Sequence, residues 1–472
     1  MEFHVQLTGR GDLAARIYRQ LLDAILDGRL RSGERLPPTR ELAERLDVSR
    51  NTVAVAYDRL TAEGFLVARV GAGTFVGAQA LPPTRPRAAP VGDVAPRALW
   101  ADVSAPAATV APDHDFRVGI PDVRLFPLRT WRRLVTRELH GPALRTAGYD
   151  DAAGHAGLRA AIARHLGVSR SVNAAPADVL ITHGAQQALD LVARVLIEPG
   201  GCVAVEEPGY PPARQLFSSL GARVIGVPVD ADGLVVDALP ADARLVHVTP
   251  SHQFPLGTAM SLARRTALLC WAERTGAAII EDDYDSEYRF GGRPLEPLQS
   301  LDRCGRVVYI GTFSKTLLPK LRLGFLIAPA SLQPALRAAK RLSDLHGDPV
   351  TQGAMAGLID EGLLGRHIRR ATRVYAARRE AVLAGLREHL DGLLSPVPSA
   401  AGLHLCARLR PGVDVDLPRV VARAAEAGVG VESLADHCAA TPPQEGLVLG
   451  YGAIDEDGVS EGLRRLAACF GR

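Results

Sequence analysis

A lysine that follows a buried apolar run offers the most reactive side chain in this sequence. Lysine occurs only at positions 315, 320 and 340 among 55 basic residues, and Lys315 ends the segment GTFSK directly after the run at 307–310. An amine at the carboxyl end of a strand faces the crevice in which α/β sheets bind ligands, where it can form an imine with an aldehyde cofactor. A solvated loop lysine is the plain alternative.

Two further strand ends carry side chains that suit the same kind of cofactor. Asp282 and Tyr284 follow the apolar run at 278–281, and Tyr210 follows the run at 203–206. A carboxylate can pair with a protonated ring nitrogen, and an aromatic side chain can stack on a flat ring. Acids that face water and a tyrosine in the core are the alternatives.

A turn of small residues completes the set. Gly184, Ala185 and Gln186 lie between the apolar run at 179–182 and a helical stretch. Backbone N–H groups at the start of a helix bind phosphate well, although an ordinary strand–helix loop has the same pattern. Together the four segments meet the needs of pyridoxal 5'-phosphate (PLP), which has an aldehyde, a ring nitrogen, a flat ring and a phosphate.

The elements that must position these residues alternate along the chain. Helical patterns separate short apolar runs, which predicts an α/β domain with a mainly parallel sheet. The predicted strands are 179–182, 203–206, 245–248, 278–281 and 307–310, and the predicted helices include 186–196 and 262–274.

The N-terminal region has a different pattern. Leu13, Ile17, Leu21 and Ile25 recur every four residues and predict a helix with one apolar face. Two short helices follow, the first with Thr39 as its expected N-cap and the second starting at 49–52, and two strands, 65–69 and 74–76, flank a glycine-rich turn. This is a helix-turn-helix with a wing, and a helical docking module without nucleic acid is the alternative.

Composition sets the domain limits and the cellular context. Residues 78–112 are rich in Pro, Ala and Arg and predict a semi-rigid linker between domains at 11–77 and 113–472. The net charge of +3 argues against general polyanion binding. Six scattered cysteines without a CxxC pair and histidines without ligand spacing predict neither disulfides nor a metal site. No long apolar segment or signal peptide is present, so we expect a cytoplasmic protein without membrane contact.

The N-terminal motifs resemble the winged helix-turn-helix of the GntR family of bacterial regulators. LPPTR at 36–40, SRNTV at 49–53, EGFL at 63–66 and GAGTFV at 71–76 stand in that family's order. The resemblance implies operator DNA as a partner. It assigns phosphate and base contacts to Arg40, Arg50, Asn51 and Thr52, and neighbouring-groove contacts to the wing tip from Gly71 to Gly73.

The C-terminal region resembles fold-type I, aspartate aminotransferase-like PLP proteins, and the whole chain resembles the MocR subfamily of GntR regulators. PSHQFP at 250–255, EDDYDSE at 281–287 and GTFSK at 311–315 are typical of that subfamily. The resemblance implies that Lys315 forms the internal aldimine with PLP, Asp282 pairs with the pyridine nitrogen and Tyr284 lies near the phenolic oxygen. It also implies that Tyr210 stacks on the ring, while the phosphate is held by Gly184, Ala185, Gln186, Thr312 and Arg322.

A tyrosine before the first strand implies a second subunit. Tyr149 matches a residue that reaches the partner subunit's phosphate in this fold. The resemblance therefore implies a head-to-tail, domain-swapped homodimer.

Two departures from the aminotransferase pattern bear on function. Phe254 replaces an asparagine that contacts the phenolic oxygen, and Val448 stands where an arginine clamps the substrate carboxylate. Arg117, Arg124 and Arg214 are the candidates to compensate. The departures favour a regulator that senses PLP or an amine over an enzyme, with PLP itself preferred as effector, as in the PdxR type that controls PLP synthesis or salvage. A working aminotransferase tethered to DNA and a PLP-binding scaffold without DNA contact are the alternatives.

Overall fold

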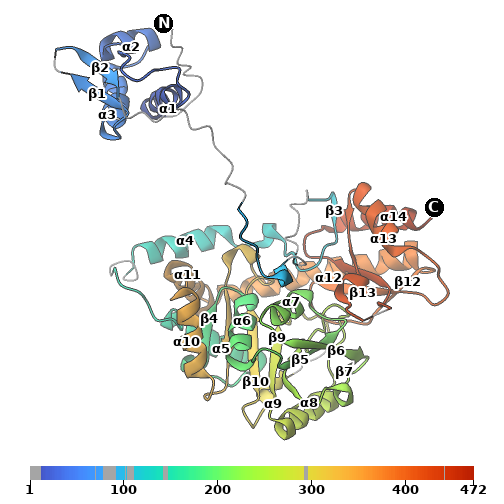
Figure 1. The fold of residues 1–472 in the computed structure, drawn as a ribbon. Helices are drawn as coiled ribbons and strands as arrows, with labels where there is room; N and C mark the ends of the chain where they lie inside the picture. The colour runs from blue at the N-terminus through green and yellow to red at the C-terminus, as the bar shows by residue number, and fades with distance from the viewer. Residues whose placement is uncertain are drawn as a thin grey trace. The chain divides into compact units, whose positions relative to one another are not determined.

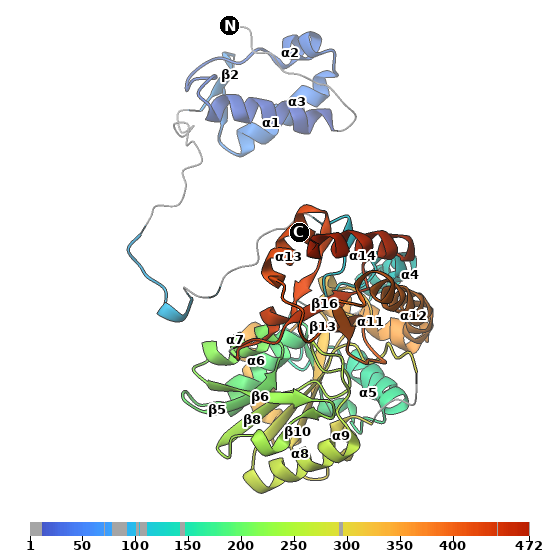
Figure 2. The same ribbon diagram turned by 90° about the vertical axis from the view of Figure 1, so that its right-hand side faces the viewer.

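The computed structural model describes residues 12–69, 71–77, 92–100, 103, 111–141, 147–291, 296–440 and 442–471. The chain divides into two compact units, Met1–Ala98 and Leu99–Arg472 (Figures 1 and 2). Most of the predicted linker, residues 78–91, 101–102 and 104–110, lies outside the described residues. None of the helices in the described segments is both long and apolar enough to cross a bilayer.

The N-terminal unit consists of three helices and a two-stranded hairpin. Ile17, Leu21 and Ile25 of the first helix are buried as predicted and pack with α3, whereas Leu13 is 36% exposed. Its elements are α1 (Leu13–Leu26), α2 (Thr39–Leu46), α3 (Arg50–Ala62), β1 (Leu66–Arg69) and β2 (Gly73–Val76). The antiparallel pairing of β1 with β2 forms the predicted wing.

The starts of α2 and α3 differ in their capping. Ser49 precedes α3, and its hydroxyl accepts a hydrogen bond from the Thr52 N–H at 3.1 Å, as an N-cap residue should. The predicted N-cap role of Thr39 is wrong, because Thr39 is already the first helical residue of α2. The residue at the cap position is Pro38, which has no side-chain acceptor, so α2 begins without a side-chain cap.

The larger unit is built on an eight-stranded, mainly parallel sheet with the order β4-β11-β10-β9-β8-β5-β6-β7. All five predicted strands belong to it. The strands are β4 (Val179–Thr182), β5 (Cys202–Glu207), β6 (Arg223–Asp230), β7 (Gly233–Leu234), β8 (Ala243–Val248), β9 (Ala278–Asp283), β10 (Val307–Thr312) and β11 (Gly324–Ile327). Neighbours from β10 through β6 run parallel, while β4, β11 and β7 join antiparallel at the two edges.

Helices cover both faces of this sheet. One face packs on α6 (Ala185–Leu196), α7 (Pro211–Ser219) and α10 (Gln333–Asp344). The other packs on α8 (Leu262–Thr275) and α9 (Leu298–Leu301) at one end, and at the other end on α4 (Leu128–Leu139), α5 (Ala156–Arg170) and α11 (Pro349–Asp360). Because both faces are buried, the strands are nearly continuous apolar runs, which is why the sequence pattern revealed them.

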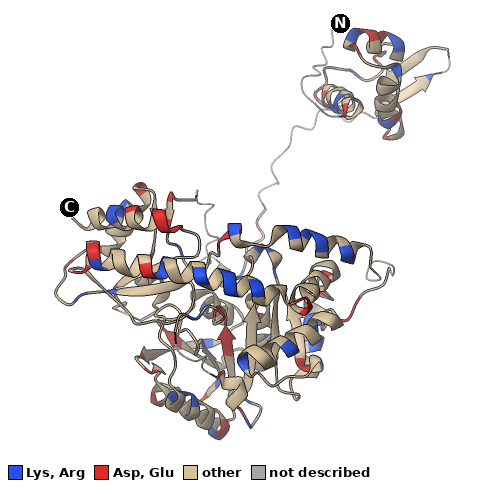
Figure 3. Ribbon diagram, turned by 180° about the vertical axis from the view of Figure 1, so that it is seen from behind, with Lys and Arg blue, Asp and Glu red and all other residues tan. Residues whose placement is uncertain are grey.

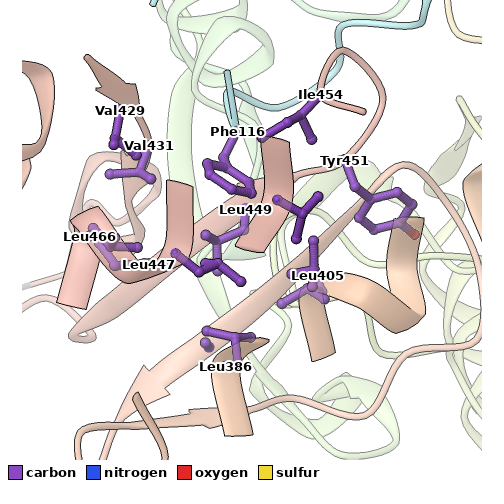
Figure 4. Close-up of a cluster of buried hydrophobic side chains, with 14 of the residues drawn as sticks. Phe116, Leu386, Leu405, Val429, Val431, Leu447, Leu449, Tyr451, Ile454 and Leu466 are labelled. Atoms are coloured by element: carbon purple, nitrogen blue, oxygen red, sulfur yellow. The ribbon is translucent and has the colours of Figure 1, made fainter. Parts of the chain in front are cut away.

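A second, antiparallel sheet with the order β12-β13-β16-β15 packs on the C-terminal helices. Its core includes Phe116 together with residues from 368 to 470, so the start and the end of the unit share one apolar cluster (Figure 4). The elements are β12 (Leu394–Pro396), β13 (His404–Leu409), β15 (Glu432–Ser433), β16 (Gly446–Gly450), α12 (Leu363–Leu390), α13 (Leu417–Glu426) and α14 (Glu456–Phe470). Beside it, β3 (His114–Asp115) pairs with β14 (Val429–Gly430).

Arginine is concentrated along α4 and α12 (Figure 3). Arg133 and Arg137 of α4 lie 2.5 and 2.8 Å from the carboxylate oxygens of Glu361. Arg378 of α12 is buried and lies 2.6 Å from Asp122. These arginines therefore fasten helices to neighbouring segments.

Candidate cofactor site and nucleic-acid interface

The predicted ligand-binding residues meet around one cavity of about 320 Å³ at the carboxyl ends of the parallel strands. Lys315 follows β10, Asp282 lies near the end of β9, and Tyr210 follows β5. Carboxyl ends of parallel strands share one edge of a sheet, so residues distant in sequence come together there. The predicted residues that line the cavity are Ala185, Gln186, Tyr210, Asp282, Tyr284, Thr312, Lys315 and Arg322.

The Lys315 side chain lines the cavity, and a backbone carbonyl holds its amine. Its Nζ donates a hydrogen bond to the Gly119 carbonyl at 2.8 Å. Burial lowers the pKa of Lys315, and the nearby carboxylates of Asp285 and Asp282 only partly oppose this effect. A lowered pKa increases the fraction of neutral amine, which is the form that attacks an aldehyde.

Asp282 presents an unpaired carboxylate oxygen. Its Oδ2 lies 3.4 Å from His247 Nε2, whereas Oδ1 is buried and has no hydrogen-bond partner. Burying a carboxylate oxygen without a hydrogen-bond donor costs free energy of folding. A ligand with a cationic N–H group would supply the missing donor. A protonated pyridine nitrogen is such a group.

The groups around Arg322 and the start of α6 suit an anion. Gly184 precedes α6 with φ +78°, and an added Cβ would lie 3.1 Å from the Arg322 guanidinium, so glycine allows the arginine to approach. No side chain caps the N-terminus of α6. The hydroxyls of Thr312 and Ser314 lie 3.0 Å apart on the neighbouring loop. The N–H groups at the uncapped start of α6, the two hydroxyls and the Arg322 guanidinium together suit a phosphate. We call this set of groups the phosphate cradle.

Aromatic side chains form part of the cavity wall. Phe254 meets Tyr210 edge-on at 5.6 Å between ring centroids and Tyr284 at 6.0 Å. The Tyr284 hydroxyl donates to the His252 carbonyl at 2.9 Å. Burial raises the pKa of Tyr210 to about 12, so this ring stays neutral and suits stacking.

The predicted DNA contacts lie on exposed parts of the N-terminal unit. Arg40, Arg50 and Asn51 are exposed, with Arg50 and Asn51 at the start of α3. The Thr52 hydroxyl lies 2.8 Å from the Ser49 hydroxyl, so Thr52 shares in the capping of α3. Gly71 and Gly73 are exposed at the wing with φ values of +77° and +111°, which glycine adopts readily.

Two family models match separate parts of this chain. Residues 13–76 match the gntR family of bacterial regulatory proteins, and residues 119–436 match aminotransferase class I and II. MocR of Rhizobium meliloti, named as a probable rhizopine catabolism regulatory protein, is 40% identical over 463 residues, which cover 96% of this chain and 93% of that protein. The chain belongs to the MocR-type GntR regulators.

Other comparisons agree with this assignment. PdxR of Corynebacterium glutamicum, named as a pyridoxine biosynthesis transcriptional regulator, is 34% identical over 448 residues. The matched region covers 94% of this chain and 93% of PdxR. Kynurenine aminotransferase of Pyrococcus horikoshii superposes with a TM-score of 0.72 and 28% identity, over 79% of this chain and 96% of that chain. The predicted fold and the predicted class of transcriptional regulator are confirmed, and the aminotransferase class implies dependence on PLP.

The regulator has an apolar residue where aminotransferases clamp a carboxylate. Val448 is fully buried and packs with Cys406 and Leu434. Each candidate to replace the clamp is engaged elsewhere. Arg117 lies 2.7 Å from Asp115, Arg124 pairs with Asp122 and Asp455, and Arg214 lies 3.6 Å from Glu207. None of the three lines the cavity.

Tyr149 of the regulator does not reach the cavity of its own chain. Its side chain is 81% exposed, and its ring lies 5.9 Å from that of His346. Gly184 lies beside Arg322 at the phosphate cradle without lining the cavity itself.

Several residues at the cavity were not predicted from the sequence. They are Val118, Gly119, Thr249, Ser314, Pro319, Asp285, Leu403 and His404. Ser314 precedes Lys315 inside the recognised GTFSK segment, so its place there was a usable signal. Gly119 and His404 come from the segment before α4 and from the second sheet, and only tertiary packing brings them to Lys315.

Gly402 leaves room for a buried polar pair, His252 and Asp285, of which Asp285 lines the cavity of the regulator. His252 Nδ1 lies 3.0 Å from Asp285 Oδ1, and the Leu403 N–H donates to Asp285 Oδ2 at 3.2 Å. Gly402 has φ +83°, and an added Cβ would clash with both the imidazole and the carboxylate. This glycine therefore allows the backbone and the polar pair to pack together.

Gly402→Ala is expected to lower the free energy of unfolding of the larger unit by about 2–4 kcal/mol, through the clash and the strained φ. Denaturant unfolding followed by tryptophan fluorescence measures the change. Gly392→Ala is the matched control, because a Cβ there meets nothing within 4 Å. Equal losses for the two variants would contradict the packing argument.

Proposed function

We propose that this regulator holds PLP at Lys315 and changes its operator binding when PLP or an amine occupies that site. The observation that carries the proposal is that Asp282, whose buried Oδ1 has no hydrogen-bond partner, lines the same cavity as Lys315 and Arg322. A ring nitrogen, an aldehyde and a phosphate in one molecule match these three features.

The residues take distinct roles toward the cofactor. Gly184, Ala185, Gln186, Thr312 and Arg322 hold the phosphate, Tyr210 stacks on the ring, and Asp282 keeps the ring nitrogen protonated. Tyr284 lies near the phenolic oxygen, and its hydroxyl is oriented by the His252 carbonyl. PLP supplies an aldehyde carbon that condenses with primary amines, either that of Lys315 or one from solution.

Asp282→Asn tests the pairing with the ring nitrogen. The amide removes the negative charge without changing the shape of the side chain, so we expect PLP affinity to fall about 10–100-fold, as for a lost charge-assisted hydrogen bond. Equilibrium dialysis against PLP measures the affinity, and the thermal unfolding temperature checks the fold. Unchanged affinity in a folded variant would remove Asp282 from the cofactor site.

A homodimer completes the proposed site. The exposure of Tyr149 supports its predicted role of reaching the partner's phosphate, because its side chain does not line the cavity of its own chain. Two winged modules, residues 11–77, would bind a paired operator through linkers at 78–112, while the domains at 113–472 dimerise head-to-tail. DNA binding responds to a ligand only if that ligand binds one arrangement of the dimer more tightly than another.

The names of relatives support two kinds of effector. PdxR is named for pyridoxine biosynthesis, which supports PLP itself as effector and PLP supply as the regulated process. MocR is named for rhizopine catabolism, which supports a catabolic ligand.

A DNA-tethered aminotransferase is the second candidate. The likeness to kynurenine aminotransferase supports it, whereas the buried Val448 opposes it. Repeated turnover of an amino donor into its keto acid would establish this activity.

Operator binding tests the proposed function. Fluorescence anisotropy of the full chain on DNA from its own upstream region would be measured with the apo protein, with PLP, and with PLP plus amines. We expect a specific, salt-sensitive complex whose affinity changes with the ligand. A complex that forms but ignores every ligand would contradict sensing, and no specific complex would contradict regulation.

A further inference from the structure

The part of the cavity around Lys315 has a charge pattern of its own. Gly119 accepts a hydrogen bond from Lys315, Asp285 and His404 interact electrostatically with it, and Arg322 lies beside Gly184 at the phosphate cradle. Its charges and hydrogen-bonding groups constrain which amine can sit beside Lys315.

The charged side chains that raise the pKa of the Lys315 amine, against the effect of burial, are all carboxylates. Asp285, Asp282 and Glu432 are the charged groups that influence it, and all three are acidic. Among the described residues, the only other cationic side chain that lines the cavity is Arg322, which donates to the His183 carbonyl at 2.7 Å. An incoming carboxylate would therefore meet repulsion at the Lys315 end, while an ammonium group would be attracted.

Glu432 is held in place near the lysine. Its Oε1 accepts a hydrogen bond from the Val118 N–H at 2.9 Å, and Gly119, the next residue, accepts from Lys315. Its Oε2 lies 3.5 Å from His437 Nε2. The acid and the loop that contacts the amine thus form one unit.

His404 adds a neutral acceptor to this end. Its Nε2 lies 3.2 Å from the Pro255 carbonyl, which can only accept, so Nε2 carries the proton and Nδ1 has a free lone pair. Burial holds the pKa of His404 well below its usual value, so the ring stays neutral. This lone pair can accept a hydrogen bond from a hydroxyl group, but a carboxylate has no hydrogen to donate to it.

We infer that the amine effector of this regulator is a small amino alcohol: a primary amine that carries a hydroxyl group and no carboxylate. The inference rests on the proposed function, since it names the ligand of the same site. The hydroxyl donates to His404, and the ammonium form is attracted by Asp285 and Glu432, since Asp282 is paired with the ring nitrogen of bound PLP. The cavity of about 320 Å³ lies at the small end of ligand pockets, so with PLP bound only a few further atoms fit.

Matched pairs of amines on one carbon skeleton test the inference. The PLP-loaded full chain would be titrated with 2-aminoethanol and glycine, 2-amino-1-propanol and alanine, and 3-amino-1-propanol and β-alanine. Cofactor absorbance and operator affinity are both recorded. We expect the amino alcohol of each pair to act at a concentration at least about tenfold lower, since one hydrogen bond gained and one repulsion avoided favour it.

Each other outcome has a definite meaning. Amino acids acting as well as amino alcohols would overturn the inference and leave the proposed function standing. A stronger response to 1,3-diaminopropane than to 3-amino-1-propanol would overturn the hydroxyl assignment, because charge alone would then select the ligand. Response to PLP but to no amine would also overturn it, whereas failure of PLP to bind would overturn the proposed function itself.

Variants of the two selecting residues sharpen the test. His404→Leu removes the acceptor and should reduce the preference for the amino alcohol about tenfold, while His404→Asn, which keeps an acceptor oxygen, should restore part of it. Glu432→Gln keeps an oxygen for the Val118 N–H but loses the charge, so it should narrow the preference severalfold. His389→Leu on α12 is the control, because His389 neither lines the cavity nor is among the charged groups that act on Lys315. An unchanged preference in both folded variants, at His404 and at Glu432, would overturn the assignment of these residues.

Discussion

Lys315→Ala is expected to abolish the visible absorption band that PLP gives when it is attached to the protein. The band requires a bond between the cofactor and a lysine amine, and Lys315 is the only lysine of the described residues that lines the cavity. Its lowered pKa and the hydrogen bond to Gly119 hold the amine ready for reaction. Absorbance spectra after incubation with PLP, followed by desalting, measure the effect.

The chain offers a matched control for this variant. Lys320 is exposed and lines a separate cavity beside Arg322, so Lys320→Ala should leave the band intact. The Lys315→Ala protein should still bind operator DNA, because the winged module is a compact unit of its own. A persistent band in Lys315→Ala, or its loss in Lys320→Ala alone, would contradict the assignment.

Arg50→Ala is expected to weaken operator binding by about 2–6 kcal/mol for a dimer, from about 1–3 kcal/mol at each of its two modules. Arg50 begins α3 and is exposed, and its Nε lies 3.5 Å from the Thr39 hydroxyl, so its guanidinium is positioned near the start of both helices of the motif. Anisotropy titrations at several salt concentrations separate a base contact, which affects specificity, from a phosphate contact, which lowers the salt slope.

A lost charge elsewhere on the module controls for general electrostatics. Arg19 is exposed on α1, so Arg19→Ala removes the same charge without touching α3. We expect it to change affinity far less than Arg50→Ala, and neither variant should alter the PLP spectrum. Equal effects of the two variants would contradict a specific role for the start of α3.

Five strands of the larger unit could be predicted because both of their faces are buried. Uninterrupted apolar runs such as 179–182 and 307–310 predict such strands. Reactive residues at the ends of these runs indicate a ligand-binding site. The second sheet was not predicted, since β12 and β15 have only three and two residues and β13 begins with the polar His404.

Local signals failed where tertiary packing decided the outcome. Thr39 has the right residue type for an N-cap, yet the extended Pro38 puts the helix start one residue earlier than expected. Gly119 and His404 lie far from Lys315 in sequence, and no periodicity connects them to it. Tertiary packing of the second sheet and of the segment before α4 brings these residues to Lys315, so only the structure shows that they line the cavity.

The unpaired Asp282 Oδ1 links the stability of the unit to its ligand. A buried acceptor without a donor weakens the apo protein, and a ligand that donates to it stabilises the folded state through binding. On the proposed function, this atom favours the form of the regulator that has the cofactor bound.

Peptide mapping after borohydride reduction tests the central claim most directly. The full chain would be incubated with PLP, reduced, digested and examined by mass spectrometry for the lysine that carries the cofactor. We predict that the reduced cofactor is on Lys315, at close to one equivalent per chain. Modification of Lys320 or Lys340 in its place, or of no lysine, would contradict the account.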